Sequence, residues 1–186
     1  MAVEPVPHLF TVDDYHAMAD AGVFAPDARV ELIEGAIYER APIGPPHASS
    51  VDRPNMLLAG AAAGRVIIRV QGPVEANRHS EPQPDLTVLA ARDDYYGGAH
   101  PRPDDILWVI EVSDTTLRFD RRVKLPMYAR SGIAEVWIVD VNAATVEVHR
   151  RLGPGGYTET IVAHPGDVVS PLALPDVTVA VAAVVG

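Results

Sequence analysis

Apolar residues fall into short runs of the kind that form strands, and the longest of these runs covers residues 106–112. That segment is apolar at every position except Glu111, which is typical of a central strand buried on both faces. Shorter runs predict further strands at 66–70, 84–89 and 136–140. Together these runs indicate that a β-sheet forms the centre of the fold.

The last third of the chain favours an antiparallel meander. Two turn-forming segments, Asn142-Ala143-Ala144 and Gly153-Pro154-Gly155-Gly156, separate three strand-like stretches, of which the last is the loosest. Near the N-terminus, residues 29–33 and 36–40 form another pair of strand-like stretches. Because Glu34-Gly35 joins them, this segment predicts an N-terminal hairpin.

Two segments in the first third of the chain have the composition of helices. Thr11-Val12-Asp13-Asp14 has the hydroxyl and carboxylate positions of a capped helix start, and Gly22 can end that helix. Residues 47–63 are rich in Ala and Leu. Pro54 lies inside this segment, so we expect the second helix either to begin near Arg53 or to kink.

A third helix is predicted at 118–130, between the strands at 106–112 and 136–140. Pro126 should kink or shorten it, unless the helix starts just before Lys124. The order strand, helix, strand is that of a crossover connection, which implies some parallel pairing. The fold class is therefore α/β or α+β, a mixed β-sheet flanked by helices, and we expect residues 1–186 to form one domain.

The chain is acidic, with 25 Asp and Glu against 15 Lys and Arg, a net charge of −10 and a pI near 5.0. Such a charge repels nucleic acids and anionic membranes, so a polyanionic partner must be recognised at a local site. There is no Cys, which excludes disulfides, thiolate zinc sites and iron–sulfur clusters. Neither a signal peptide nor an apolar run of about 18 residues is present, so we expect a cytoplasmic protein with no membrane partner.

Glu111 is the most informative polar residue, because an ionised carboxylate in a buried strand needs a compensating partner. Asp85 at a strand start, Glu31 in the hairpin and Lys124 in the following helix are the candidate partners. Carboxylates converging with a lysine suit a hard cation bound through oxygen. Two simpler interpretations stay open: Asp85 is a turn residue, and Glu111 faces solvent from an edge strand.

Other catalytic motifs are missing. The seven histidines form no H-E-x-x-H pattern, so a zinc site is not expected. Ser49 and Ser50 lack the G-x-S-x-G context of a serine hydrolase, and no glycine-rich phosphate loop is present. We therefore expect no organic cofactor.

Several short motifs spread over nearly the whole chain resemble one family. They are Val30 to Gly35, His47, Pro84-Asp85, Glu111-Val112-Ser113, Asp120 with Lys124, Tyr128 to Ile133, Glu135 to Asp140 and Pro165-Gly166-Asp167. In this combination the chain resembles the Uma2 family of proposed endonucleases, formerly a domain of unknown function, within the PD-(D/E)xK nuclease superfamily. The resemblance implies a restriction-endonuclease-like core.

For the site, the resemblance implies that Asp85, Glu111 and the backbone carbonyl of Val112 bind Mg²⁺, with Mn²⁺ as a substitute. Glu31 would bind the metal through water or help to orient it. The wider superfamily has an E-x-K motif, whereas this chain has Ser113 at the lysine position. The lysine role then passes to Lys124, which would position the water or stabilise the transition state.

The resulting hypothesis is a metal-dependent endonuclease that hydrolyses DNA phosphodiester bonds and acts as a homodimer, since cutting two strands needs two sites. His47, Arg121 and Arg122 are the candidate substrate-binding residues, although the basic stretch around these arginines can equally be a solvated helix face. Two alternatives remain. One is a non-catalytic binding or regulatory module on a nuclease fold, and the other is a structural protein in which Glu111 pairs with an arginine.

Overall fold

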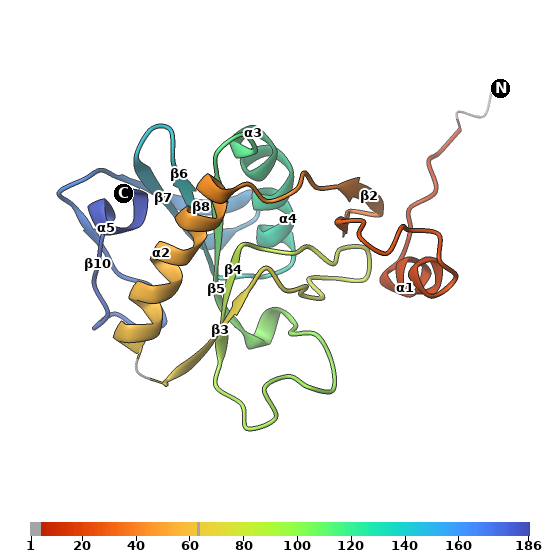
Figure 1. Ribbon diagram of the computed structural model, residues 1–186, viewed down its shortest axis with the longest axis horizontal. Helices are drawn as coiled ribbons and strands as arrows, with labels where there is room; N and C mark the ends of the chain where they lie inside the picture. The colour runs from red at the N-terminus through yellow and green to blue at the C-terminus, as the bar shows by residue number, and fades with distance from the viewer. Residues whose placement is uncertain (1–4, 63) are drawn as a thin grey trace.

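The computed structural model describes residues 5–62 and 64–186, and its centre is a six-stranded sheet (Figure 1). In spatial order the strands are β3 (Val66–Val70), β4 (Leu86–Ala90), β5 (Ile106–Ser113), β6 (Glu135–Asp140), β7 (Thr145–Gly153) and β8 (Gly156–Ala163). β5 and β6 pair in parallel, and the other neighbours pair antiparallel. The mixed sheet, its parallel crossover and the antiparallel β6–β7–β8 meander confirm the fold class expected from the sequence.

Helices cover both faces of this sheet. They are α1 (Val12–Asp20), α2 (Pro45–Ala62), α3 (Leu117–Phe119), α4 (Leu125–Arg130) and α5 (Val181–Val185), with a 3₁₀ turn η1 (Pro103–Asp105) and a π-helical segment η2 (Asp120–Lys124). α2 and α5 share one hydrophobic cluster, and α4 packs into another. No helix in the described part of the chain is both long and apolar enough to cross a bilayer.

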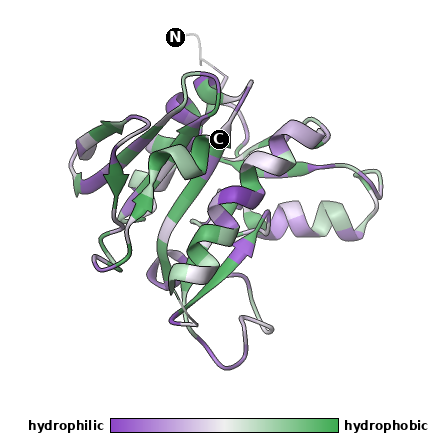
Figure 2. Ribbon diagram, turned by 60° about the vertical axis from the view of Figure 1, so that its left-hand side comes forward, coloured by the Kyte–Doolittle hydropathy of each residue, from purple (hydrophilic) through white to green (hydrophobic). Residues whose placement is uncertain are grey.

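The central strand β5 is buried on both faces, as the apolar run predicts. Trp108 and Ile110 face the cluster that contains α2 and α5, whereas Val109 faces the cluster that contains α4. Figure 2 shows the long central strands as largely hydrophobic. Because side chains alternate along a strand, Glu111 lies on the same face as Val109, beneath the crossover helices.

Helix α2 starts earlier than Pro54 suggests. It begins at Pro45 and continues through Pro54, so the predicted start near Arg53 is wrong. Pro45 and Pro46 occupy the first helical positions, where no N–H donor is needed. Pro54 does leave the carbonyl of Ser50 without its helical donor, yet the buried ring of Pro54 packs in the helix face that meets the sheet.

The crossover between β5 and β6 contains the π-helical segment. The N–H of Leu125 donates to the carbonyl of Asp120, five residues earlier, just before Pro126. This wider turn separates the proline ring from the carbonyls that it would meet in a regular helix. The helix therefore continues past Pro126 instead of ending there, and Asp120, Lys124 and Tyr128 all point inward and are buried.

The N-terminal elements pack at one end of the molecule, away from α5 and β10 (Figure 1). Thr11 and Asp14 form the expected capping box of α1. β1 (Val30–Ile33) and β2 (Ala36–Glu39) form the expected antiparallel hairpin. A second small pair, β9 (Val168–Val169) with β10 (Val179–Ala180), precedes α5.

The hairpin turn brings the backbone of Gly35 close to Leu9. Glu34 and Gly35 have φ values of 53° and 78°, as a tight two-residue hairpin turn requires. A Cβ atom on Gly35 would lie 2.6 Å from the Cβ and 2.9 Å from the Cα of Leu9. Glycine is thus required here both by the backbone conformation and by the close contact.

We expect Gly35→Ala to lower the free energy of unfolding by about 2–4 kcal/mol, because a positive φ and an overpacked contact both disfavour the methyl group. Gly22→Ala is the matched control. Gly22 also has a positive φ, of 71°, but a Cβ atom there meets nothing within 4 Å, so a loss of about 1 kcal/mol is expected. Urea unfolding of the two variants measures the difference, and equal losses would contradict the role of the Leu9 contact.

Candidate active site

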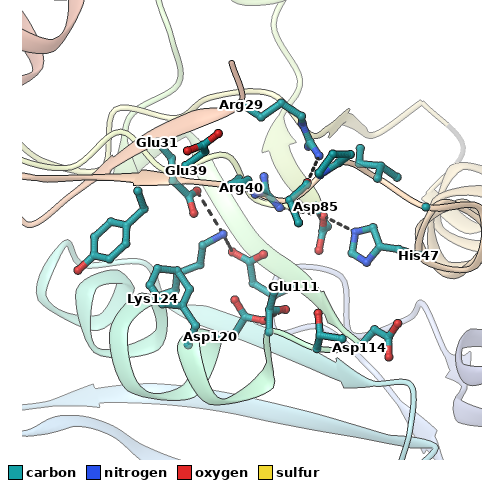
Figure 3. A pocket seen from close by; sticks show the side chains of 18 of the residues that line it. Arg29, Glu31, Glu39, Arg40, His47, Asp85, Glu111, Asp114, Asp120 and Lys124 are labelled. Atoms are coloured by element: carbon teal, nitrogen blue, oxygen red, sulfur yellow. Dashed lines mark hydrogen bonds and ion pairs between the residues drawn. The ribbon is translucent and has the colours of Figure 1, made fainter. Parts of the chain in front are cut away.

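A pocket of about 360 Å³ lies where the β1–β2 hairpin, the start of α2, the ends of β4 and β5, and the crossover helices meet (Figure 3). Its floor carries the ionisable side chains that the sequence singled out: Glu31, Asp85, Glu111 and Lys124. Each of these four residues is at most 2% exposed. Segments more than ninety residues apart in sequence therefore contribute to one buried polar site.

Strand register brings the two central carboxylates together. β4 and β5 are antiparallel, with Leu86 opposite Ile110. Extending this register by one residue places Asp85 beside Glu111. The expectation that these residues lie in the same site is thus met, and neither residue is on a solvent-facing edge.

Asp85 is held by donors from four segments. Its Oδ2 accepts a hydrogen bond from the N–H of Val112 at 2.9 Å, and its Oδ1 accepts from His47 Nε2 at 3.1 Å and Gln71 Nε2 at 3.2 Å. A guanidinium nitrogen of Arg40 is 3.5 Å from the same Oδ1. Burial alone would raise the pKa of Asp85, but the His47 hydrogen bond and the charge of Lys124 lower it to about 2.

Glu111 accepts two hydrogen bonds on a single oxygen. Lys124 Nζ donates to Oε1 at 3.0 Å, and the hydroxyl of Tyr128 donates to the same atom at 2.5 Å. Burial raises the pKa of Glu111, and the positive charge of Lys124 opposes this rise. Within the described residues, these donors leave Oε2 for another ligand.

Lys124 lies between two carboxylates. Its Nζ is 3.0 Å from Glu111 Oε1 and 3.3 Å from Glu31 Oε2 (Figure 3). Burial lowers the pKa of Lys124, but Glu111 and Glu31 raise it above its ordinary value, so the ammonium stays charged. Glu31 is also fixed by the N–H of Gln83, which donates to Oε2 at 3.0 Å.

Asp120 has a different partner from the one its spacing suggests. The sequence allows a helical ion pair with Lys124, but Asp120 Oδ2 accepts hydrogen bonds from Ser113 Oγ and Thr116 Oγ1, both at 2.7 Å. Ser113, which replaces the lysine of the E-x-K motif, therefore orients a further buried carboxylate. Burial raises the pKa of Asp120, and the charge of Lys124 opposes this.

The predicted substrate-binding residues divide into two groups. His47 lines the pocket, and its hydrogen bond to Asp85 raises its pKa. Arg121 instead forms an ion pair with Glu147 on β7, and Arg122 is exposed outside the pocket lining. Neither arginine lines the pocket, because Asp120 and Lys124 face inward and the residues between them point to other sides of the helix.

Sequence reasoning missed three residues that contact Asp85 or Glu111. Arg40 follows the hairpin in a segment with no distinctive pattern, and Gln71 lies in a loop, so neither gave a signal. Tyr128 lies four residues after Lys124, on the same helical side, and this spacing could have identified it. Because Glu111 bonds to Lys124 and Tyr128, the alternative in which it merely pairs with an arginine is not met.

The donor set fits a hard divalent cation in chemical kind, since it consists of carboxylate and carbonyl oxygens. The N–H and C=O groups of one strand residue point to the same side, so the carbonyl of Val112 faces the edge at which its N–H meets Asp85. Within residues 5–62 and 64–186, however, no three His, Asp or Glu side chains converge as a metal site. Hydrogen bonds occupy both oxygens of Asp85, and the ammonium of Lys124 separates Glu31 from Glu111.

The fold is a mixed sheet flanked by helices, and carboxylates and a lysine meet near the ends of two adjacent strands. This combination defines a restriction-endonuclease-like fold. The model of the Uma2 family, described as "Putative restriction endonuclease", matches residues 12–182. The chain belongs to the Uma2 family.

The structure is also similar to the crystal structure of a "putative nuclease belonging to DUF820" from Anabaena variabilis. The TM-score is 0.70 at 15% sequence identity, over 95% of this chain and 97% of that chain. At this identity the likeness concerns the fold. No curated protein matches the sequence significantly.

Lys124→Met should lower the free energy of unfolding by about 3–5 kcal/mol, because it leaves Glu31 and Glu111 as buried charges without their shared cation. Arg122→Met, an exposed position in the same helical segment, is the control and should change stability by about 0.5 kcal/mol or less. Chemical unfolding in EDTA provides the comparison. Similar stability of both variants would mean that the ammonium does not hold the carboxylates together.

Proposed function

We propose that this protein is a metal-dependent endonuclease that hydrolyses phosphodiester bonds of DNA, with Mg²⁺ as the cofactor and Mn²⁺ as a substitute. The observation that carries the proposal is the convergence of Glu31, Asp85, Glu111 and Lys124, each nearly inaccessible, on one pocket. Burying four ionisable groups is costly, and such groups are concentrated at functional sites. The family description supports the same class of reaction.

Asp85, Glu111 and the carbonyl of Val112 are the groups that would hold the metal. When bound, a divalent cation neutralises charge on a phosphate oxygen and lowers the pKa of a coordinated water. Asp85 is suited to this role because its low pKa keeps it ionised at neutral pH. Glu31 would assist from the hairpin, through its contact with Lys124.

Lys124 would act directly on the reacting phosphate. An ammonium has three N–H donors, of which Glu31 and Glu111 engage two. The third can donate to a water or to a phosphate oxygen as negative charge develops there. In the hydrolysis, the water oxygen bonds to phosphorus and the bridging P–O bond breaks. The products are a phosphate monoester and a hydroxyl group, and the departing oxygen takes up a proton.

The phosphate-binding role of Arg121 and Arg122 is replaced in this proposal by residues that line the pocket. Arg29, Arg40 and His47 are the cationic or protonatable groups on its walls, besides Lys124. The homodimer remains part of the proposal, since cutting both strands of a locally unpaired duplex requires two sites. Conversion of a plasmid to the linear form, rather than the nicked form, tests that point.

A second candidate function is a non-catalytic binding or regulatory module on the nuclease fold. One observation favours it. Lys124 contacts Glu31 and Glu111, and His47 and Arg40 contact Asp85. Among the described residues, no three His, Asp or Glu side chains form a metal site in this conformation. A site that stays closed in this way would bind no metal. The two candidates therefore differ in their response to divalent cations.

Metal binding should stabilise the folded protein. Because a ligand that binds the native state raises its stability, Mg²⁺ or Mn²⁺ at about 100 times the dissociation constant should add about 2.7 kcal/mol. Asp85→Asn should abolish the shift in melting temperature, whereas Asp13→Asn, at an exposed position of α1, should retain it. If wild-type protein and Asp85→Asn respond alike, the ion does not bind at Asp85, and the non-catalytic function gains support.

Nicking of supercoiled plasmid DNA tests the chemistry. Mg²⁺ should support nicking and EDTA should stop it. Glu111→Gln and Lys124→Arg should each reduce the rate by about 10²-fold or more, as expected when an electrostatic or proton-transfer group is lost. Arg122→Met should nick at the wild-type rate, and circular dichroism verifies that each variant is folded. Full activity of both site variants would refute the assignment.

A further inference from the structure

The pocket has an apolar wall as well as a polar floor. Tyr38 of β2 and Phe119 of α3 both line it and are half-buried. Their rings make an edge-to-face pair, with centroids 5.0 Å apart and planes at 63°. Pro42 and Ile43, from the exposed segment between β2 and α2, continue this wall. Aromatic faces of this kind stack on nucleobases without regard to sequence.

The depth of the floor restricts the form in which a nucleic acid can reach it. Asp85, Glu111 and Lys124 are each 2% exposed, and the pocket above them measures about 360 Å³. A duplex is stiff over this length and carries its phosphates on the outside of a wide helix. A nucleotide that has left the helix can turn its phosphate into a recess, so the buried floor favours an unpaired strand.

The charge of the pocket also disfavours a duplex. Six carboxylates line it against three Lys and Arg side chains, and the whole chain has a net charge of −10. A duplex presents one negative charge about every 1.7 Å and needs a basic track along its backbone. In contrast, one phosphodiester that enters with a cation meets Lys124, Arg40 and His47. The lining thus matches one or a few phosphates.

We infer that the substrate is single-stranded or locally unpaired nucleic acid, with one base packed against the wall formed by Tyr38 and Phe119 and its phosphate drawn to the floor. The inference rests on the proposed nuclease function and names the form of its substrate. Apolar wall and polar floor then have separate roles. Tyr38 and Phe119 bind the base, and the buried charged groups act on the phosphate.

Cleavage rates on matched substrates provide the first test. One labelled DNA oligonucleotide is supplied as a single strand, as a full duplex, and as a duplex with an unpaired internal segment. With Mg²⁺, the wild-type protein should cut the single strand and the unpaired segment at least about tenfold faster than the duplex, because unpairing and unstacking a base costs a few kcal/mol. A duplex cut as fast as the single strand overturns the inference while leaving the proposed function intact.

Substitutions in the aromatic wall provide the second test. Tyr38→Leu and Phe119→Leu keep apolar bulk but remove the aromatic ring, and each should raise KM for the single strand by about 5- to 100-fold, the range expected from loss of one base stack. Tyr95→Leu is the control, since Tyr95 is 72% exposed and lies outside the pocket lining. Unchanged KM in both wall variants contradicts the stacking role.

A binding measurement separates failure of the inference from failure of the proposed function. Fluorescence anisotropy with Glu111→Gln and Mg²⁺ compares the labelled single strand with the duplex. Tighter binding of the single strand, weakened by Phe119→Leu, supports the inference even if the wild-type protein cuts no substrate and the endonuclease proposal fails. Equal or weaker binding of the single strand overturns the inference whatever the cleavage result.

Discussion

The ammonium of Lys124, held between Glu111 and Glu31, is the interaction on which the arrangement of the site depends. Three charged groups are removed from water here, and desolvating each costs several kcal/mol unless the partners stay in contact. The three residues come from the crossover helix, the central strand and the N-terminal hairpin. These elements must therefore assemble together, and a displacement of one exposes the charges of the others.

Two local features of the backbone make this contact possible. The π-helical turn before Pro126 keeps the crossover helix continuous and directs Lys124 and Tyr128 at the same carboxylate. At the sheet, β4 begins at Leu86 while β5 extends to Ser113. The N–H of Val112 thus lies beyond the paired part of β4, and the side chain of Asp85 accepts its hydrogen bond. The site forms where the lengths of adjacent strands differ.

A buried site also fits the proposed action of an acidic protein on a polyanion. With a net charge of −10, the surface does not favour long contacts with a nucleic-acid backbone. Acids on the pocket floor are matched by Lys124, Arg40 and His47, so repulsion is reduced locally where a phosphate would enter. Recognition would then depend more on access to the pocket than on electrostatic attraction between the protein surface and the nucleic acid.

The sequence by itself determined the strands, the hairpin at Glu34-Gly35, the parallel crossover and the anomalous Glu111, because alternation and turn chemistry are local properties. It also named Asp85 and Lys124 as candidate partners of Glu111, and the resemblance to a family implied their roles. Only the tertiary structure decided which side of the crossover helix meets the sheet, and so turned Arg121 toward Glu147. It also placed Arg40 beside Asp85. The reason is physical: periodicity defines faces within one element, whereas the contacts between elements depend on helix phase, strand length and the packing of distant segments.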